Sequence, residues 1–352
     1  MKNKVFVFSF LIIIYGFMMI SIFDKNLEFS YNERRYLATL PSFEFNTKTS
    51  NKVEKYLLDH FPLRDSFRKI KGLFNYNVLF KLENNDVYIK DNYVFKSIYP
   101  LNKKSIDNYN SYLDNMNKLF TSNNNVYFMI IPDKNYYLND KNFLNIDYDY
   151  LYNNVGIKYN SIDLRNILSL EDYYFTDTHW RQENLEKVVF ELSKKMKFNY
   201  ENIEYKKNNY SKFYGIYYGE SLNNKPDTLT YLSNDIIDNS KVFYLENDKL
   251  NSVYNPSKLG LMDSYDVYLD GASSFIEITN NNCYRDKELV IFRDSFGSSI
   301  SPLLINYYSK ITIIDNRYIS SNYFKDLIKF DDQDILIMNS TMIINDSFTL
   351  KN

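Results

Sequence analysis

The sequence predicts an α/β fold in which a parallel sheet is flanked by helices. In the last third of the chain, apolar strand-like runs at 288–292, 311–314 and 334–338 alternate with helix-like stretches. Earlier, a helix-like stretch from residue 105 leads into another apolar run at 126–131. Consecutive strands joined by helices pair in parallel through right-handed crossovers. With 352 residues, 45% of them hydrophobic, the chain can hold one large or two modest domains.

The first element is an uncharged apolar run at residues 5–23, preceded by two lysines. A run of about 19 apolar residues spans a bilayer. The upstream lysines predict a cytoplasmic N-terminus and an exported remainder. No small-X-small motif closes the run, so an uncleaved signal anchor over 1–24 is favoured over a cleaved signal peptide. We therefore expect a single-pass protein of the cell membrane with an extracellular domain.

Residues 25–50 are expected to form an extended linker, and residues 51–352 the extracellular catalytic domain. Helical periodicity predicts a first helix over 51–61. His60 lies at its end, directly after an aspartate. Because no nucleophile motif is nearby, we expect His60 to have a structural role.

The middle of the chain contains several shorter elements. A hairpin is expected over 86–95, and Ser105 is expected to cap the helix that precedes the strand at 126–131. A short strand at 162–164 and a helix at 182–196 follow. Residues 199–255 are polar and rich in tyrosine. They form either an excursion that lines a groove or a solvated loop region.

The chain has two histidines, and His179 lies in an Asp-X-His sequence beside the one tryptophan, Trp180. In this spacing Asp177 can hold the imidazole in one tautomer and stabilise its charged form. The tripeptide alone is weak evidence, because it is common and a lone histidine is usually structural.

A candidate nucleophile follows the apolar strand at 288–292, in the sequence Arg293 to Gly297. A strand, a sharp polar turn with a serine and then glycine present a nucleophilic hydroxyl at a strand end. The alternative for Ser295 is a helix N-cap. With so few histidines in the chain, Ser295 and His179 together favour catalysis.

Other polar residues follow the predicted strands. Asp133, Arg317 and Asn339 should lie with Ser295 at the carboxyl edge of the sheet, where ligands bind in α/β folds. The net charge of −2 offers no basic field for nucleic acid. A single cysteine, Cys283, excludes an intrachain disulfide framework and a cysteine-based zinc site. We expect no metal and no cofactor.

The exported part resembles the bacterial DHHW proteins, relatives of the AlgX and AlgJ alginate O-acetylation proteins in the SGNH hydrolase superfamily. The similar stretches keep the order of that family and are residues 32–37, 40–41, 59–65, 174–180, 265–278, 293–297 and 314–318. The resemblance implies an SGNH hydrolase-like (flavodoxin-like) sheet. It also implies a catalytic triad of Asp177, His179 and Ser295.

The chain departs from the DHHW pattern at two positions. Thr178 stands where many relatives have histidine, which leaves the Asp-His pair intact. Ala272 stands where relatives have an asparagine that would donate to an oxyanion, and losing one such donor costs about 100- to 1,000-fold in rate. Gly271, Ser295 or Ser273 would have to serve instead.

The resemblance implies a serine-dependent O-acetyltransferase that modifies an exported polysaccharide, with a membrane-bound acyltransferase as the acetyl donor partner. Trp180, Arg317 and Asn339 are further candidates for substrate binding. If water accepts the acetyl group, the protein is an acetylesterase. A surface protein that binds glycan without catalysis is the rival from a different class, and the tyrosine-rich stretch is consistent with it.

Overall fold

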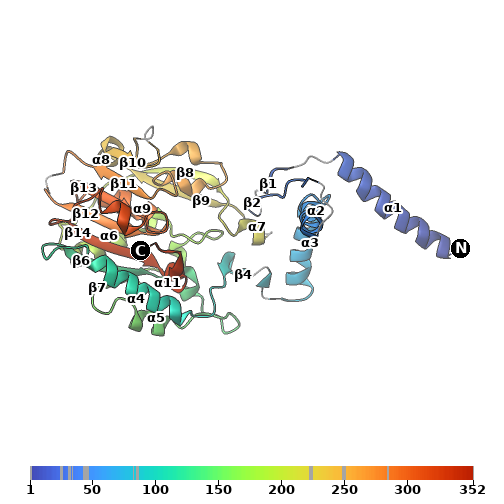
Figure 1. Ribbon diagram of the computed structural model, residues 1–352, viewed down its shortest axis with the longest axis horizontal. Coiled ribbons are helices and arrows are strands. Elements are labelled where there is room, and N and C mark those ends of the chain that lie inside the picture. The colour runs from blue at the N-terminus through green and yellow to red at the C-terminus, as the bar shows by residue number, and fades with distance from the viewer. Residues whose placement is uncertain are drawn as a thin grey trace. The chain divides into compact units, whose positions relative to one another are not determined.

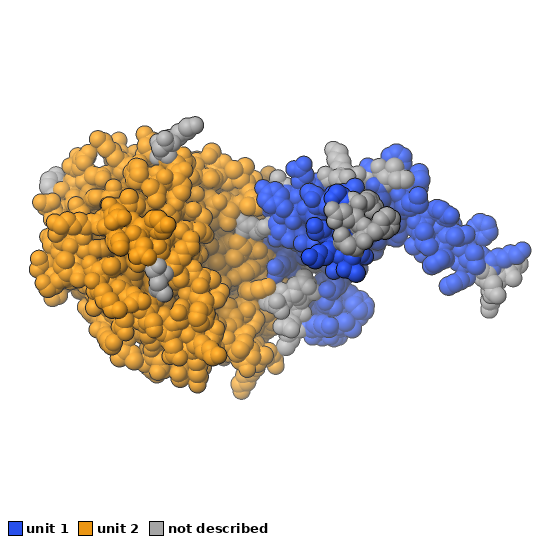
Figure 2. Space-filling model, viewed as in Figure 1, with its two compact units in different colours: residues 1–85, 218–223 blue, residues 86–217, 224–352 orange. Residues whose placement is uncertain are grey.

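The structure is a computed structural model that describes residues 2–23, 27–30, 33, 35–42, 47–81, 83–84, 87–221, 225–247, 251–283 and 285–351. The chain divides into two compact units, coloured separately in Figure 2. The first comprises residues 1–85 with 218–223, and the second comprises residues 86–217 with 224–352. Residues 51–85, which the sequence analysis assigns to the catalytic domain, therefore belong to the first unit.

The first unit contains the apolar N-terminal helix. Residues 4–21 of this helix have a mean hydropathy of 2.1, and the helix is long and apolar enough to cross a membrane. Strands β1 and β2 pair antiparallel. The described elements of this unit are α1 (Lys2–Phe23), β1 (Phe29–Ser30), β2 (Arg35–Tyr36), α2 (Thr47–Asp59), α3 (Arg64–Asn77), β3 (Glu83–Asn84) and α7 (Tyr218–Ser221).

An ion pair ties the segment after β1 to the end of α2. Arg35 donates to both carboxylate oxygens of Asp59, at 2.9 and 2.5 Å, and the N–H of Ala38 donates to the same carboxylate at 2.8 Å. These contacts with Arg35 and Ala38 lower the pKa of Asp59 well below its usual range, although burial opposes them. His60 Nε2 lies 2.9 Å from the carbonyl oxygen of Ala38, which gives His60 a structural role. Part of the expected linker is thus attached to a helix.

A seven-stranded sheet forms the centre of the second unit (Figure 1). Five strands are parallel, whereas β11 runs antiparallel to both of its neighbours. In spatial order the strands are β10 (Lys241–Tyr244), β11 (Phe275–Thr279), β13 (Lys310–Ile314), β12 (Glu288–Arg293), β14 (Asp334–Ser340), β6 (Asn125–Ile131) and β7 (Asn160–Asp163). The predicted α/β class is confirmed, with an antiparallel edge that the sequence did not indicate.

Each face of the sheet packs against its own set of helices, because successive side chains of a strand point to opposite faces. In β6, Phe128 and Ile130 pack with α4 (Lys103–Asn117), α5 (Tyr148–Asn154) and α11 (Thr341–Asn345). Met129 and Ile131 pack with α6 (Glu186–Met196) and α9 (Gly297–Leu304) on the other face. The second unit is therefore a three-layer sandwich.

The remaining elements lie around this sandwich. The expected hairpin is formed by β4 (Val87–Lys90) and β5 (Tyr93–Lys96), while Asp86 lies outside the described residues. The other elements are β8 (Lys206–Phe213), β9 (Asp227–Ser233), α8 (Asp235–Asn239), α10 (Ser321–Phe324) and the 3₁₀ turns η1 (Lys134–Tyr137), η2 (Leu170–Asp172), η3 (Gln182–Asn184), η4 (Pro256–Lys258), η5 (Ser264–Val267) and η6 (Ser347–Thr349).

One local expectation was wrong, and one of the two alternatives left open for residues 199–255 is excluded. Asn102, not Ser105, caps α4, because the Asn102 side chain accepts the Ser105 N–H at 3.2 Å. The Ser105 hydroxyl is buried and donates to the carbonyl of Ile344 at 2.8 Å. Residues 199–255 are not a solvated loop region, since β8 and β9 pair antiparallel there and β10 joins the central sheet.

Candidate active site

The histidine motif lies on a narrow loop between residues 173 and 180. Tyr173 and Trp180 form an antiparallel bridge at its base, and the Tyr174 N–H donates to the His179 carbonyl at 3.1 Å. At the tip, one oxygen of Asp177 accepts the backbone N–H of His179 at 3.0 Å and lies 2.6 Å from its Nδ1. The two-residue spacing thus lets one carboxylate oxygen fix both the backbone and the ring of His179.

The second oxygen of Asp177 accepts the backbone N–H of Ile216 at 2.9 Å. Burial of Asp177 by itself would raise the pKa of this carboxyl, but the charge and hydrogen bonds of His179 and the N–H of Ile216 outweigh it. The pKa of Asp177 therefore lies well below its usual range, and the carboxylate is ionised at neutral pH.

Ser295 lies in the tight turn between the end of β12 and the start of α9. Asp294 fixes this turn, because its carboxylate accepts the Phe296 N–H at 3.0 Å and the Ser340 N–H at 2.7 Å. Gly297 is needed for space, since a Cβ at this position would lie 2.5 Å from the Cβ of Arg293. The turn is thus held both by its own backbone and by the end of β14.

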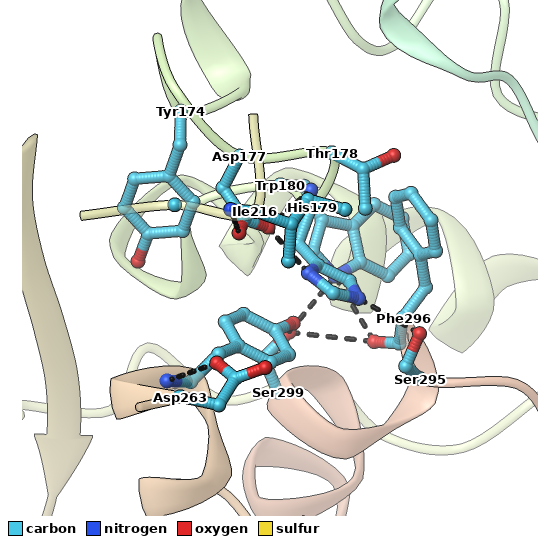
Figure 3. Close-up of polar contacts among 12 residues, drawn as sticks. Tyr174, Asp177, Thr178, His179, Trp180, Ile216, Asp263, Ser295, Phe296 and Ser299 are labelled. Carbon is cyan, nitrogen blue, oxygen red and sulfur yellow. Dashed lines mark hydrogen bonds and ion pairs between the residues drawn. The ribbon is translucent and has the colours of Figure 1, made fainter. Parts of the chain in front are cut away.

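The structure brings Asp177, His179 and Ser295 together (Figure 3). Ser295 Oγ lies 2.8 Å from His179 Nε2, within hydrogen-bond reach. Asp177 and His179 are buried, whereas Ser295 is partly exposed. Ser295 does not cap α9, whose N-cap residue is Phe296. The arrangement places the hydroxyl of a partly exposed serine against an imidazole that Asp177 orients.

Aromatic residues support the imidazole from within the fold. The Tyr265 ring stacks on the His179 ring, with centroids 3.9 Å apart and planes 10° apart. The hydroxyl of Tyr265 and the indole N–H of Trp180 both donate to Ser299 Oγ, at 2.9 and 2.8 Å. Trp180 is fully buried, so in this structure it supports the site from beneath and offers no face to a sugar.

Asp227, the first residue of β9, holds the sides of the loop. Its carboxylate accepts the backbone N–H groups of Phe175 and Thr176 at 2.9 and 2.8 Å. It also pairs with the Arg181 guanidinium at 2.9 Å. The tyrosine-rich region thus contributes Asp227 and Ile216 to the support of the histidine loop.

Lys134 lies beneath the same loop and is 2% exposed. Its ammonium donates to the carbonyl oxygens of Tyr174, Phe175 and Asp177 at 3.1, 3.2 and 2.6 Å. Burial lowers the pKa of Lys134 to about 7, against the opposing attraction of Asp177 and Asp227. The three carbonyls therefore depend on one buried amine.

The two candidate oxyanion donors near Ala272 are engaged elsewhere. The Gly271 N–H donates to the Tyr268 carbonyl at 3.2 Å, and the Ser273 hydroxyl donates to Glu246 at 2.6 Å. Gly271 has a φ of 82°, and a Cβ there would lie 2.3 Å from an Asp266 oxygen, so this turn requires glycine. Ala272 itself is exposed.

The other sequence-predicted residues at the strand ends also have partners. Arg317 donates to both oxygens of Asp315, at 2.9 and 2.7 Å, and remains partly exposed. Asn339 is buried and accepts the Tyr109 hydroxyl at 2.7 Å. Asp133 accepts the Thr341 and Tyr148 hydroxyls at 2.5 and 2.9 Å. Among the described residues, no hydrogen bond joins any of these three to Ser295.

Sequence reasoning missed the residues that hold the histidine loop. Lys134, Asp227 and Ile216 are 39 to 52 positions from their hydrogen-bond partners in that loop. Tyr265 lies in a stretch that resembles the DHHW proteins, but no pattern in the sequence indicates that it stacks on His179. Of these residues, only Lys134 could have been identified as a candidate from the sequence, because it lies just after a predicted strand.

No family model and no curated protein matches the chain. Among solved structures, a DHHW family protein from Eubacterium siraeum aligns with a TM-score of 0.62 and 21% identity over 76% of this chain and 95% of that one. Bacillus cereus PatB1, solved with a sulfonyl adduct, aligns with a TM-score of 0.57 and 16% identity over 76% of this chain and 100% of that one. The resemblance to DHHW proteins is thus confirmed at the level of the fold.

Proposed function

We propose that this chain is an SGNH hydrolase-like O-acetyltransferase that acetylates a cell-surface or exported polysaccharide through an acetyl-Ser295 intermediate. The observation that carries the proposal is the chain of contacts from Asp177 through His179 to the hydroxyl of the partly exposed Ser295. A histidine held by a buried carboxylate and bonded to a serine is the arrangement that activates a nucleophilic hydroxyl. The fold shared with a DHHW protein and with PatB1 supports the assignment.

In the first half-reaction His179 carries its own proton on Nδ1, facing Asp177, and accepts the Ser295 proton on Nε2. Ser295 Oγ attacks the carbonyl carbon of an acetyl ester, and the tetrahedral intermediate expels the donor alkoxide. The alkoxide takes the proton from Nε2, which leaves acetyl-Ser295. In the second half-reaction a sugar hydroxyl gives its proton to Nε2 and attacks the acetyl carbonyl, and Ser295 leaves with that proton.

The oxyanion of each intermediate needs hydrogen-bond donors. Within the described part of the chain, the Ser295 N–H forms no backbone hydrogen bond, so it is free to donate to the oxyanion. The Gly271 N–H and the Ser273 hydroxyl would have to leave their present partners first. We therefore assign Ser295 N–H as one donor.

The proposal also includes an extracellular location for the catalytic domain and a membrane-bound partner that donates the acetyl group. The N-terminal helix α1 supports a single-pass anchor, and the lysines before it favour an extracellular catalytic domain. A membrane-bound acyltransferase would supply acetyl groups at that surface. A polysaccharide would then be acetylated where it leaves the membrane.

The test uses the full-length protein in detergent. A sulfonyl fluoride should label Ser295, located by mass spectrometry of the peptide, and PatB1 has itself been solved with a sulfonyl adduct. Ser295→Ala should abolish this labelling, and His179→Ala should reduce it strongly because an unactivated serine is a poor nucleophile. His60→Ala, in the first unit, is the matched control and should be labelled normally.

The second arm supplies an activated acetyl ester with and without an oligosaccharide. Acetylated oligosaccharide supports transfer, whereas acetate alone would make the protein an esterase. Normal folding with no labelling of Ser295 and no release of acetate would contradict catalysis and leave a glycan-binding surface protein.

A further inference from the structure

Helix α3 in the first unit exposes apolar side chains along one face. Phe67, Ile70 and Phe74 recur at helical spacing along one face, and they are 44%, 61% and 50% exposed. Gly72 and Asn75, on the other side of the helix, are buried. A helix on a protein surface in water shows the opposite pattern.

Ion pairs hold the polar side of α3 in place. Arg64 donates to Glu33 at 2.6 Å, and the Arg68 guanidinium pairs with the other oxygen of the same carboxylate. The Arg35–Asp59 pair lies beside them, with Arg64 3.9 Å from Asp59. Turning the helix to bury its apolar side would break these pairs, so the outward position of that side is built into the unit.

The exposed apolar residues from the end of α2 to the residues just after α3 are together called the apolar face, and within it the Phe61 and Phe67 ring centroids lie 6.0 Å apart. It consists of Leu57, Leu58, Phe61, Leu63, Phe67, Ile70, Phe74, Val78 and Leu79. This face is continuous with α1, because the Phe17 ring lies 5.4 Å from the Phe61 ring and 5.8 Å from the Phe67 ring, between centroids. The apolar face therefore joins the helix that is able to cross a membrane.

The helices that carry the apolar face are basic. Together α2 and α3 contain seven lysines and arginines and three acidic residues, although the whole chain has a net charge of −2. Lys52, Lys55, Lys69 and Lys71 are exposed. Basic residues beside an exposed apolar surface are attracted to anionic lipid headgroups.

We propose that α2 and α3 lie on the bilayer that α1 crosses, with the apolar face at the boundary between headgroups and acyl chains. These helices have 13 and 14 residues, about 20 Å of helix, and are too short to span the bilayer. Phe17 lies four residues before the end of the candidate span at Ser21, about 6 Å along the helix axis. Interfacial helices bury their apolar side by about 5–10 Å, so the contacts of Phe17 place Phe61 and Phe67 at that depth.

This proposal is independent of the catalytic one and commits to lipid as the occupant of the apolar face. The consequence is a second attachment to the membrane beside α1. A single helix lets the exported residues swing freely, whereas an interfacial pair fixes the orientation of the first unit relative to the bilayer.

The test places a fluorophore on the full-length protein in nanodiscs of phosphatidylcholine and phosphatidylglycerol. Cys283→Ser removes the one native cysteine, and Ile70→Cys or Asp65→Cys then receives an environment-sensitive dye. Asp65 is the matched control because it is exposed on the opposite side of α3. Lipids with a doxyl quencher near the carbonyl end of the acyl chain should quench the dye at 70 at least about twofold more strongly than the dye at 65.

Three results would overturn the proposal. Equal and weak quenching with water-like emission at both positions would leave the apolar face in solvent. Blue-shifted emission at 70 without lipid quenching would show that protein, either a membrane partner or a second copy, covers the face. Equal and strong quenching at both positions would place α3 within the bilayer and not at its surface.

Discussion

At the scale of single residues, the two carboxylate oxygens of Asp177 make different hydrogen bonds. One oxygen binds the backbone and ring of His179, and the other is held by the Ile216 N–H. The carboxylate is therefore fixed on both sides, and its lowered pKa keeps it ionised through the neutral range.

We expect Asp177→Asn to lower kcat by about four orders of magnitude, because an amide at this position favours the wrong tautomer of His179. Acetate release from an activated ester measures the loss. His60→Ala should retain full activity, since His60 contacts Ala38 in the first unit. A reversed result, with His60 essential and Asp177 dispensable, would refute the assignment of the histidine.

Lys134→Met should destabilise the second unit by about 2–4 kcal/mol, because it leaves buried carbonyls of the histidine loop without their donor. The loss should depend on pH. Between the pKa of about 7 in the folded protein and the ordinary value of 10.5, the unfolded chain holds a proton that the folded protein has released. Above pH 7, the free energy of unfolding of the wild type therefore rises by up to about 1.4 kcal/mol per pH unit relative to that of the variant. Below pH 7 this difference does not change with pH.

Thermal unfolding at pH 6.5 and 8.5, followed by fluorescence of the single tryptophan, checks this pH dependence. Lys194→Met is the control. Lys194 is exposed on α6, and among the described residues its one ion pair is with Glu191. Parallel pH profiles for wild type and Lys134→Met would contradict the lowered pKa.

At the scale of elements, the histidine loop is held by parts of the chain that lie far from it in sequence. The turn after β8 provides Ile216, the start of β9 provides Asp227, and η1 provides Lys134. The sequence indicated the triad residues because each lies in a short local motif. It did not indicate the supporting residues, because their role depends only on tertiary contacts.

The same physical limit explains the element that was placed wrongly. Ser105 and Asn102 are both good capping residues by chemistry. The choice between them depends on the buried contacts of Ser105 with Ile344 and Ser347, 239 and 242 positions away. The strands of the parallel sheet were predictable because a strand buried on both faces is a continuous run of apolar residues, which can be seen in the sequence itself.

Gly215→Ala should damage the site through its loop. A Cβ at residue 215 would lie 2.4 Å from the backbone of Thr176 and 2.5 Å from the Cβ of Asp177. The turn would have to move away, and the Ile216 hydrogen bond to Asp177 would be lost. We expect a destabilisation of about 1–3 kcal/mol together with a fall in kcat. Lys212→Ala, at an exposed position on β8, should leave kcat within about twofold in the acetate-release assay, since surface substitutions change little. Equal effects of the two substitutions would contradict the packing argument.

At the scale of the whole molecule, the chain consists of a basic unit that contains the apolar helix α1 and an α/β unit that contains the triad. The native Cys283 reports on the side of the membrane where the α/β unit lies, because it is partly exposed and is the one cysteine of the chain.

A maleimide that cannot cross membranes should label Cys283 in intact, wall-stripped cells without detergent. The charge bias before α1 is the reason to expect this orientation. In a Cys283→Ser background, Lys4→Cys should be labelled only after permeabilisation. Labelling of Cys283 only after permeabilisation would place the α/β unit in the cytoplasm and contradict the exported location.

The strand order of the sheet makes the turn that holds Ser295 depend on a strand far along the chain. Strand β14 lies between β12 and β6, and the N–H of its residue Ser340 donates to Asp294, the residue before Ser295. Without β14, neither β12, which leads into the turn that holds Ser295, nor β6 has its neighbour on that side. The chemistry proposed for Ser295 would therefore require that β14 is already in place in the sheet.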